Sequence, residues 1–461
     1  MSIASCTIHF TKKTGRVVYA TRLLLNHLQL NPGTTINLIL GQKVTRVALK
    51  RVKKTGKHLY IPANICNELN IPASGKCYAL NRRGNEIKLG PLVGIMSSVQ
   101  SRGGTRLTGG QHDYVKALLK AAKNHGFYYA FNPQDINWQQ NTVKGFFYGK
   151  GGTWQQKTVS LPDVVYNRHP SRKIEKSAFM KSLKERLQMK QIPIFNWSYF
   201  DKWDIYHLLQ GESEAISHIP ESYIDPSPEQ IRMMLEKHRF IYLKPTGGSL
   251  GFGIYRLTYS PKRGYFARYR QNVKNILLRF SKFTELMRLL NRQKGRRLRN
   301  HVAQQGIRLI ELDKCPIDFR FHLNKNGKNQ WVVSAVGAKK AGRGSVTTHV
   351  RTGGQLMTPE YVLKHVYGEQ KAAEILQNAK QTAIKLAQAI ERNYPYLIGE
   401  LGMDIGIDKK GKVWMFEANA KPGRSIFKHP ELKPLGYKSM DYIFQYCAYL
   451  SRFHITDAEA D

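Results

Sequence analysis

Acidic residues are scarce in this chain of 461 residues: 32 Asp and Glu stand against 73 Lys and Arg, which leaves a formal net charge of +41. Cysteine is also rare, because only five residues are scattered along the chain and no two of them form a Cys-x-x-Cys pair. A disulfide framework and a cysteine-based zinc site are therefore not supported. The excess of positive charge either favours polyanionic partners or is an adaptation for solubility.

Long apolar segments are missing as well. No run of about 18 apolar residues occurs, so no membrane-spanning helix is expected. Residues 1–16 lack the apolar core of a signal peptide, which predicts a cytoplasmic protein that is not secreted by the general route. Apolar residues make up 41% of the chain and aromatic residues 11%, as is typical of a globular protein with room for several domains.

Two domains are predicted to precede the region that carries the motifs. Residues 1–91 show short alternating runs separated by turn signals, which predicts a small all-β, barrel-like domain with one short helix over 62–69. This domain carries no catalytic set of residues, so recognition, assembly or a structural role is expected. Residues 92–195 alternate strands and helices, which predicts an α/β domain with a mostly parallel sheet. Its glycine-rich segment 149–153 lies between two strands, which favours a hairpin turn over a phosphate loop.

The segment 244–253 indicates phosphate binding. An apolar strand over 240–243 leads into Lys244-Pro-Thr-Gly-Gly-Ser-Leu-Gly-Phe-Gly253. Glycines allow backbone N–H groups to approach an anion, Ser249 adds a hydroxyl donor, and Lys244 can reach the same anion. A strand follows, so the segment is not a Walker A loop; we interpret it as a flap over phosphates, with a glycine-rich hairpin without a ligand as the alternative. The glycines concerned are Gly247, Gly248, Gly251 and Gly253.

Residues 256–308 form a basic block. The block contains fifteen Lys and Arg and a single acid, Glu285. The aromatic residues between these cations would suit the binding of single-stranded nucleic acid. However, the apolar residues over 276–290 follow helical spacing, which favours a buried core for them instead. Binding of polyanions or nucleic acid by this block is kept as an alternative.

Residues 399–427 are predicted to form a β-hairpin that carries a metal site. Asp404 stands on the first arm, and Glu417 and Asn419 stand two residues apart at the end of the second, so their side chains share a face. Such oxygen ligands suit a hard, partly hydrated ion such as Mg²⁺ that is shared with substrate phosphates. The alternative is an exposed hairpin with solvated acids.

Cationic residues near the hairpin suit an anionic substrate. The turn from Lys421 to Arg424 follows the second arm directly and suits a phosphate or a carboxylate. In Asp318-Phe319-Arg320, Arg320 is a candidate phosphate clamp, and a structural Asp–Arg pair with another strand is the alternative.

This order of motifs resembles the ATP-grasp superfamily, and the spacing of Asp404, Glu417 and Asn419 is similar to that of the D-alanine–D-alanine ligase branch. Several stretches are similar to the YheC/YheD-like endospore coat-associated ATP-grasp family. They are residues 90–95, Val165-Tyr166-Asn167-Arg168, Asp201-Lys202-Trp203, 244–253, 318–320 and 419–424. The resemblance implies an α+β ATP-grasp fold over 196–461. Two α+β subdomains (196–305 and 306–455) would grip ATP, after a pre-ATP-grasp domain and the barrel-like domain.

The resemblance also implies a role for each matching residue. Lys202 and Lys244 would bind the ATP phosphates, residues 247–253 would cover them, and Gln304, Gln305 and Ile307 would line the adenine cleft. Arg320 and Arg424, with Lys421 in the same turn, would hold the γ-phosphate and the acyl phosphate, while Asp404, Glu417 and Asn419 would bind Mg²⁺. The family places an arginine after Val336, where this chain has Lys339 and Lys340, which lack the bidentate fork.

The function implied is that of an ATP- and Mg²⁺-dependent ligase. A carboxylate would be phosphorylated to an acyl phosphate, which an amine attacks to form an amide. The carboxylate and amine substrates are unknown, the charge of the chain favours acidic or polymeric ones, and association with the spore coat is expected. The alternatives are a non-catalytic, ATP-binding or structural spore coat protein and a nucleic-acid-binding protein.

Overall fold

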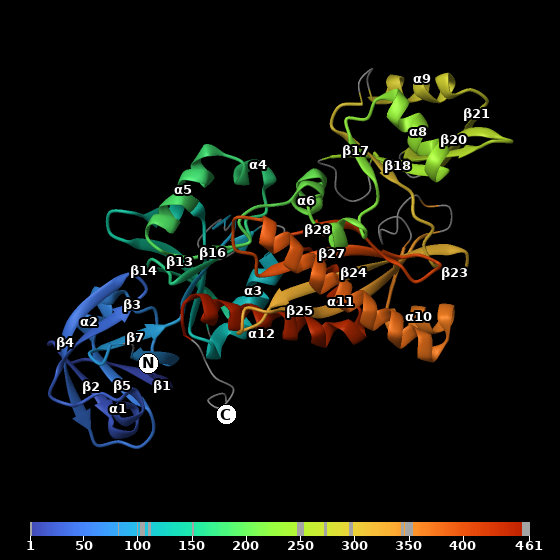
Figure 1. Cartoon of the computed structure of the whole chain (residues 1–461). Helices are drawn as coiled ribbons and strands as arrows, with labels where there is room; N and C mark the ends of the chain where they lie inside the picture. The colour runs from blue at the N-terminus through green and yellow to red at the C-terminus, as the bar shows by residue number, and fades with distance from the viewer. Residues whose placement is uncertain are drawn as a thin grey trace.

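The structure is a computed structural model that describes residues 2–81, 83–98, 100–101, 107–108, 112–149, 152–246, 253–271, 274–294, 298–342, 345 and 354–453. Its parts follow one another along an extended molecule (Figure 1). A barrel that contains the N-terminus lies at one end, a six-stranded sheet lies at the other, and two further sheets with long helices lie between them. Within the described ranges, no helix is both long and apolar enough to cross a membrane.

The barrel confirms the prediction for the N-terminal residues in outline. Seven strands close in the order β1-β5-β2-β4-β3-β7-β6, and their inward-facing side chains form its core. Two short helices pack on it: α2 (Ala63–Leu69) was expected, whereas α1 (Arg22–Leu28) makes the all-β prediction wrong. The strands are β1 (Ser2–Thr11), β2 (Val17–Thr21), β3 (Thr35–Leu40), β4 (Lys43–Val52), β5 (His58–Pro62), β6 (Gly75–Asn81) and β7 (Glu86–Gly90).

The two barrel helices belong to a repeated strand–helix–strand unit. Each helix follows a strand directly and ends at a residue with left-handed backbone conformation, Gln29 (φ 55°) or Asn70 (φ 53°). The next residue then donates its N–H back into the helix, from Leu30 to Leu25 O at 3.0 Å and from Ile71 to Cys66 O at 2.9 Å. The same local geometry therefore turns the chain into β3 and into β6.

The second sheet is mixed rather than mostly parallel. Its strands run in the order β12-β13-β11-β8-β15-β16, and β8, β11, β15 and β16 pair in parallel. β13 and β14 pair antiparallel around residues 149–153, which confirms the predicted hairpin and accounts for the mixed character. The elements are β8 (Leu92–Met96), β11 (Phe127–Phe131), β12 (Ile136–Asn137), β13 (Thr142–Tyr148), β14 (Trp154–Ser160), β15 (Val164–Asn167), β16 (Ile194–Phe195), α3 (His112–Ala121), α4 (Arg172–Glu175) and α5 (Ala178–Met189), with the short pair β9 (Gln100–Ser101) and β10 (Leu107–Thr108).

The six-stranded sheet runs in the order β17-β22-β18-β19-β20-β21, and helices α8 and α9 cover one of its faces. The basic block contributes four of these strands, β19 to β22, and its helix begins only at Phe283. The helical spacing read from 276 onward was therefore wrong for β21, where Leu277 is 55% exposed. The elements are β17 (Ser222–Ile224), α8 (Pro228–His238), β18 (Phe240–Pro245), β19 (Tyr255–Ser260), β20 (Gly264–Gln271), β21 (Lys274–Phe280), α9 (Phe283–Lys294) and β22 (His301–Gln305).

The last sheet carries the predicted hairpin. Its order is β26-β25-β24-β27-β28 with every pair antiparallel, and its apolar face packs against the long helix α11. Gly368 separates the helices α10 and α11. The elements are α6 (Lys202–Leu209), α7 (Ser213–Ile216), β23 (Glu311–Leu312), β24 (Cys315–Lys325), β25 (Trp331–Lys340), β26 (Gln355–Met357), α10 (Pro359–Tyr367), α11 (Glu369–Asn393), β27 (Glu400–Ile407), β28 (Val413–Asn419) and α12 (Lys433–Leu450).

Candidate functional site

The hairpin β27–β28 brings the three predicted metal ligands together. Asp404 lies opposite Glu417, and Gly402 lies opposite Asn419, in antiparallel register. The residues that alternate with them, such as Met403 and Ala418, are buried in the core beneath the sheet. Asp404, Glu417 and Asn419 therefore share the face directed away from α11, as the hairpin pattern predicts.

Two cations hold the carboxylate of Asp404. The Arg320 guanidinium on β24 donates to it from Nε at 2.9 Å and from Nη2 at 2.8 Å, and Lys339 Nζ on β25 donates at 3.0 Å. Burial by itself would raise the pKa of Asp404, but these two cations outweigh burial and hold that pKa well below its usual value. Lys339 also lies 3.2 Å from Asp318. The structure thus shows the Asp–Arg pair with another strand that the sequence left open.

Gly402 makes room for this pair. A Cβ atom at Gly402 would lie 2.9 Å from Arg320 Nη1 and 2.5 Å from Pro422 Cβ. Any larger residue at this position would therefore push the guanidinium away from Asp404. Arg320 fills the space beside the hairpin because its neighbour on β27 has no side chain.

The residues around Asp404 fit a magnesium ion. Among the described residues, no hydrogen bond or ion pair engages the carboxylate of Glu417, so its oxygens are available. The described part of the chain contains no group of three or more His, Cys, Asp or Glu side chains placed to hold a metal, so the set amounts to two carboxylates and one amide oxygen. Mg²⁺ prefers oxygen ligands and is usually bound by one or two carboxylates together with substrate phosphates and water.

Lys244 lies between the six-stranded sheet and the hairpin. Its Nζ donates to Gln304 Oε1 at 2.7 Å, and it lies over the rings of Tyr242 on β18 (5.4 Å) and Phe416 on β28 (5.9 Å). Gln304, Gln305 and Ile307 are the residues predicted to line the adenine cleft, and Ile307 is buried. Gln305 N donates to a neighbouring carbonyl at 2.8 Å, so this backbone donor is already used within the protein.

Part of the predicted nucleotide site lies outside the described residues. This applies to Gly247, Gly248, Ser249 and Gly251 of the flap and to the side chain of Lys202, whose backbone begins α6. Gly253 is described and has a left-handed backbone with φ 73°. The roles of these residues stay predictions.

A fully buried carboxylate, Glu400, organises a second cluster that the sequence analysis missed. Its Oε2 accepts from Arg168 at 3.0 Å and from the hydroxyl of Tyr166, while its Oε1 accepts from His322 at 2.8 Å and from Arg424 at 3.2 Å. Burial raises the pKa of Glu400, but these partners outweigh it and lower the pKa to about 2. The sequence contained a signal for Glu400. Side chains alternate between the two faces of a strand, so residues 400, 402 and 404 share one face of β27.

Two of the residues predicted to be catalytic pair with other carboxylates. Arg424 contacts Glu400 and donates to Gly436 O at 2.9 Å, so it is held against α12. Lys421 lies 2.9 Å from Glu175, and burial, with nearby cations, lowers the pKa of Lys421 to about 7. Arg320 is therefore the residue of this group that the structure places with the predicted metal ligands.

We expect acid to destabilise the fold through His322. Burial, followed by the nearby Arg424 and Arg320, lowers the pKa of His322 to about 4, so the ring is neutral at neutral pH and donates from Nε2 to Glu400. The unfolded chain binds the proton near its ordinary pKa of about 6.5, so this contribution is full above that pH and declines as pH falls toward 4. Between about pH 7 and pH 5 the loss is about 2 kcal/mol.

This prediction is checked by thermal melting at the two pH values. His322→Gln is expected to show a smaller drop in melting temperature between pH 7 and pH 5 than the wild type. The exposed His365 on α10 provides the control, and His365→Gln should leave the wild-type pH dependence unchanged. An unchanged pH dependence in His322→Gln would show that His322 is not the residue that titrates.

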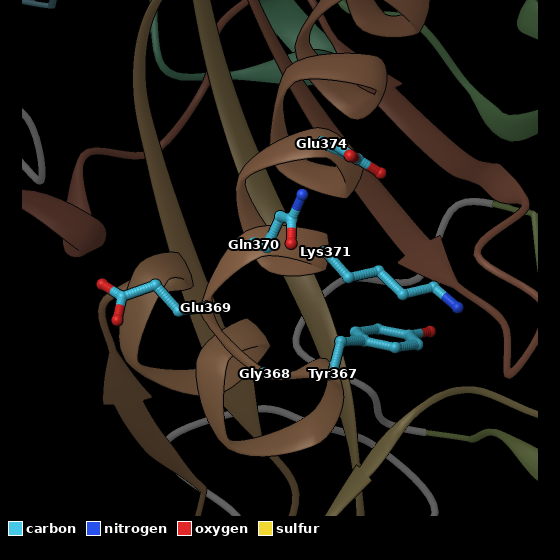
Figure 2. A pocket seen from close by; sticks show the side chains of 6 residues that line it. All are labelled: Tyr367, Gly368, Glu369, Gln370, Lys371 and Glu374. Atoms are coloured by element: carbon cyan, nitrogen blue, oxygen red, sulfur yellow. The ribbon is translucent and has the colours of Figure 1, made fainter.

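A shallow pocket of 350 Å³ lies elsewhere, at the corner between α10 and α11 (Figure 2). Lys371 lies over the ring of Tyr367 at 5.8 Å, and Glu374 on α11 also lines the pocket. None of the predicted site residues lines this pocket, so we separate it from the candidate site.

Comparison with known proteins agrees with the resemblance read from the motifs. The model of the YheC/D like ATP-grasp family matches residues 191–450. The endospore coat-associated protein YheD of Bacillus subtilis (strain 168) is 34% identical over 429 residues, which cover 92% of this chain and 93% of YheD. The endospore coat-associated protein YheC of the same organism is 26% identical over 345 residues, which cover 72% of this chain and 92% of YheC.

A solved structure, the D-alanine–D-alanine ligase from Coxiella burnetii, aligns with 78% of this chain and 94% of its own at a TM-score of 0.42 and 12% identity. The family model matches more than half of the chain, and the match to YheD extends over nearly all of it. The chain therefore belongs to the YheC/D-like ATP-grasp family.

Proposed function

We propose that this protein is an ATP- and Mg²⁺-dependent ligase that joins a carboxylate to an amine. The observation that supports this most is the placement of Asp404 between Arg320 and Lys339, on the same face as Glu417 and Asn419. Two acids that already lie beside cations suit a site where a metal ion and phosphate groups bind together.

The reaction is a phosphoryl transfer followed by an acyl transfer. The γ-phosphoryl group passes from ATP to a carboxylate oxygen and ADP leaves; an amine then attacks the acyl carbon, and phosphate leaves as the amide forms. When bound, Mg²⁺ supplies charge neutralisation for the β- and γ-phosphates. Catalysis of this kind depends on positioning and electrostatics, so no protein nucleophile is required.

In this proposal, the Lys and Arg residues of the candidate site have different roles. Lys244 and Lys202 hold the ATP phosphates beneath the flap, and Arg320 holds the γ-phosphate. Lys339 stands where the family has an arginine. Its contact with Asp404 supports the proposal that this lysine takes the place of that arginine. Arg424 and Lys421 act on the acyl phosphate, which requires a change in their present contacts with Glu400 and Glu175.

Association with the spore coat is also part of the proposal. YheD and YheC of Bacillus subtilis are both named endospore coat-associated proteins, and the match to YheD extends over 92% of this chain. The charge of +41 favours an acidic or polymeric substrate in that setting.

Thermal melting with Mg²⁺ and ATP tests the nucleotide site. Ligand at about 100 times its Kd stabilises the folded state by about 2.7 kcal/mol, which raises the melting temperature by a few degrees. Glu417→Gln removes a metal ligand, so its shift should be much smaller. Glu374→Gln, in the pocket between α10 and α11, is the matched control and should keep the full shift.

The outcomes of this melting experiment show whether and where the nucleotide binds. No shift in the wild type would contradict nucleotide binding, and a shift lost only in Glu374→Gln would move the site to the other pocket. Release of ADP that depends on an added carboxylate then separates a ligase from an ATP-binding coat protein without turnover.

A further inference from the structure

One face of the N-terminal barrel is strongly cationic and has no role in the proposed ligase. Residues 2–91 contain fifteen Lys and Arg but only two acids, Glu68 and Glu86. Glu68 accepts from Thr45 at 2.7 Å and pairs with Arg16 at 3.4 Å, and Glu86 is buried. Within the described residues, neither acid forms an ion pair with the Lys and Arg residues of segment 50–57.

A row of side chains crosses four strands of this face, with one lysine and three rings. Lys50 on β4 lies opposite Tyr19 on β2, Tyr19 lies opposite Tyr60 on β5, and Tyr60 lies opposite His9 on β1. The residue that precedes each of them on its strand is buried in the barrel core, so this row points outward. These buried residues are Ile8, Val18, Leu49 and Leu59. The rings of His9 and Tyr60 stack, with centroids 4.7 Å apart and planes 15° apart.

Lys and Arg residues accompany this row of rings. The segment from Lys50 to Lys57 includes the end of β4 and the connection to β5, and it contains five Lys and Arg in eight residues. Lys54 Nζ lies 5.0 Å from the centre of the Tyr60 ring. No ion pair engages Lys50, Arg51, Lys53 or Lys54 within the described residues. Burial, with His58 and Lys54 nearby, lowers the pKa of His9, so this ring is neutral at neutral pH and serves for stacking.

The face is directed away from the rest of the molecule. The barrel contacts the second sheet through its other strands: Gln42 N, after β3, donates to Ser160 Oγ at 3.0 Å, and Lys88 on β7 pairs with Asp163 at 2.6 Å. Strands β5 and β2 lie opposite β3 and β7 in the order of the barrel. Figure 1 shows β2 and β4 on the side of the barrel far from the sheets.

We propose that this barrel face binds single-stranded nucleic acid. The Lys and Arg of the β4–β5 segment provide contacts for a phosphate backbone, and the row of rings provides surfaces on which unpaired bases stack. A duplex keeps its bases stacked on each other and would leave the rings unused. A phosphate that attracts Lys54 also uncovers the ring of Tyr60, which couples the two kinds of contact.

The first test asks whether the nucleic-acid site lies on the barrel. The probe is a fluorescently labelled oligothymidylate of about 15 nucleotides, and its anisotropy is followed with the full-length protein. The double variant Lys53→Glu with Lys54→Glu is expected to bind at least about 10-fold more weakly, with the salt slope reduced by about 1 to 1.5. The matched control, Lys262→Glu with Arg263→Glu, changes the charge equally on the exposed tip of β19–β20 and should bind as the wild type does.

The second test asks whether the rings take part. Tyr60→Leu keeps every charge and is expected to weaken oligothymidylate binding about 5- to 150-fold while leaving binding of inorganic polyphosphate unchanged. Unaltered melting temperatures show that each variant is folded. The proposal is overturned if oligothymidylate does not bind, if the control variant loses as much affinity as the barrel variant, or if Tyr60→Leu weakens neither probe. The last result would reduce the face to a patch for any polyanion.

Discussion

Glu400→Gln is expected to lower the free energy of unfolding by about 3–5 kcal/mol. Glu400 is fully buried and is the one acid that faces both Arg168 and Arg424 within the described part of the chain. Breaking a buried ion pair by removing one partner leaves uncompensated charge in the interior, which costs more than the pair itself contributes. Denaturant unfolding of the variant and of the wild type measures the difference.

A surface acid with an equally short contact provides the control for this experiment. Glu214 lies 2.6 Å from Lys385, but their side chains are 68% and 62% exposed, so water screens the pair. Glu214→Gln should therefore unfold with little or no change. Equally small effects in both variants would contradict the view that the Glu400 cluster holds the fold together.

The Glu400 cluster also connects parts of the chain that fold into different sheets. Arg168 follows β15 of the second sheet, whereas Glu400 begins β27. Arg168 further donates to Pro422 O at 3.0 Å, in the turn that follows the candidate metal ligands. Loss of Glu400 should therefore affect the turn beside the candidate site as well as the overall stability.

Local signals in the sequence were enough to predict several elements. Helix α8 begins at Pro228 because Ser227 and Gln230 form a capping box and the proline fits the first helical turn, and both signals can be read in the sequence. The hairpin was predictable because period-two alternation and a glycine-containing turn determine its register. The shared face of the three predicted metal ligands followed from that register, because they lie on one hairpin.

Contacts between distant segments could not be predicted from the same signals. Asp404 meets Arg320 because β24 pairs with β27, and the sequence gives no direct sign of that pairing. Arg168 and Glu400 are 232 residues apart, and only the docking of two sheets brings them together. The helix α1 was missed for a related reason, since its seven residues are held by burial of Leu24, Leu25 and Leu28 against the barrel rather than by a strong local pattern.

Asp404→Asn is expected to remove most of the effect of Mg²⁺ on nucleotide binding. The substitution takes away the charge of a predicted oxygen ligand and leaves Arg320 and Lys339, both partly buried beside it, without their shared acid. We expect the affinity for Mg²⁺-ATP to fall on the order of 10- to 100-fold, or further, since even partners of metal ligands have effects of that size. Titration with ATP in the presence and absence of Mg²⁺ measures the metal-dependent part directly.

Asp318 offers a matched control on the neighbouring strand. Its side chain is 15% exposed against 19% for Asp404, and it contacts the same Lys339, at 3.2 Å, but it is not one of the predicted metal ligands. Asp318→Asn should therefore keep most of the Mg²⁺-dependent affinity. Equal losses in the two variants would mean that the charge around Lys339, rather than coordination by Asp404, governs nucleotide binding. The difference between two similar carboxylates thus decides whether the face of the hairpin is a metal site.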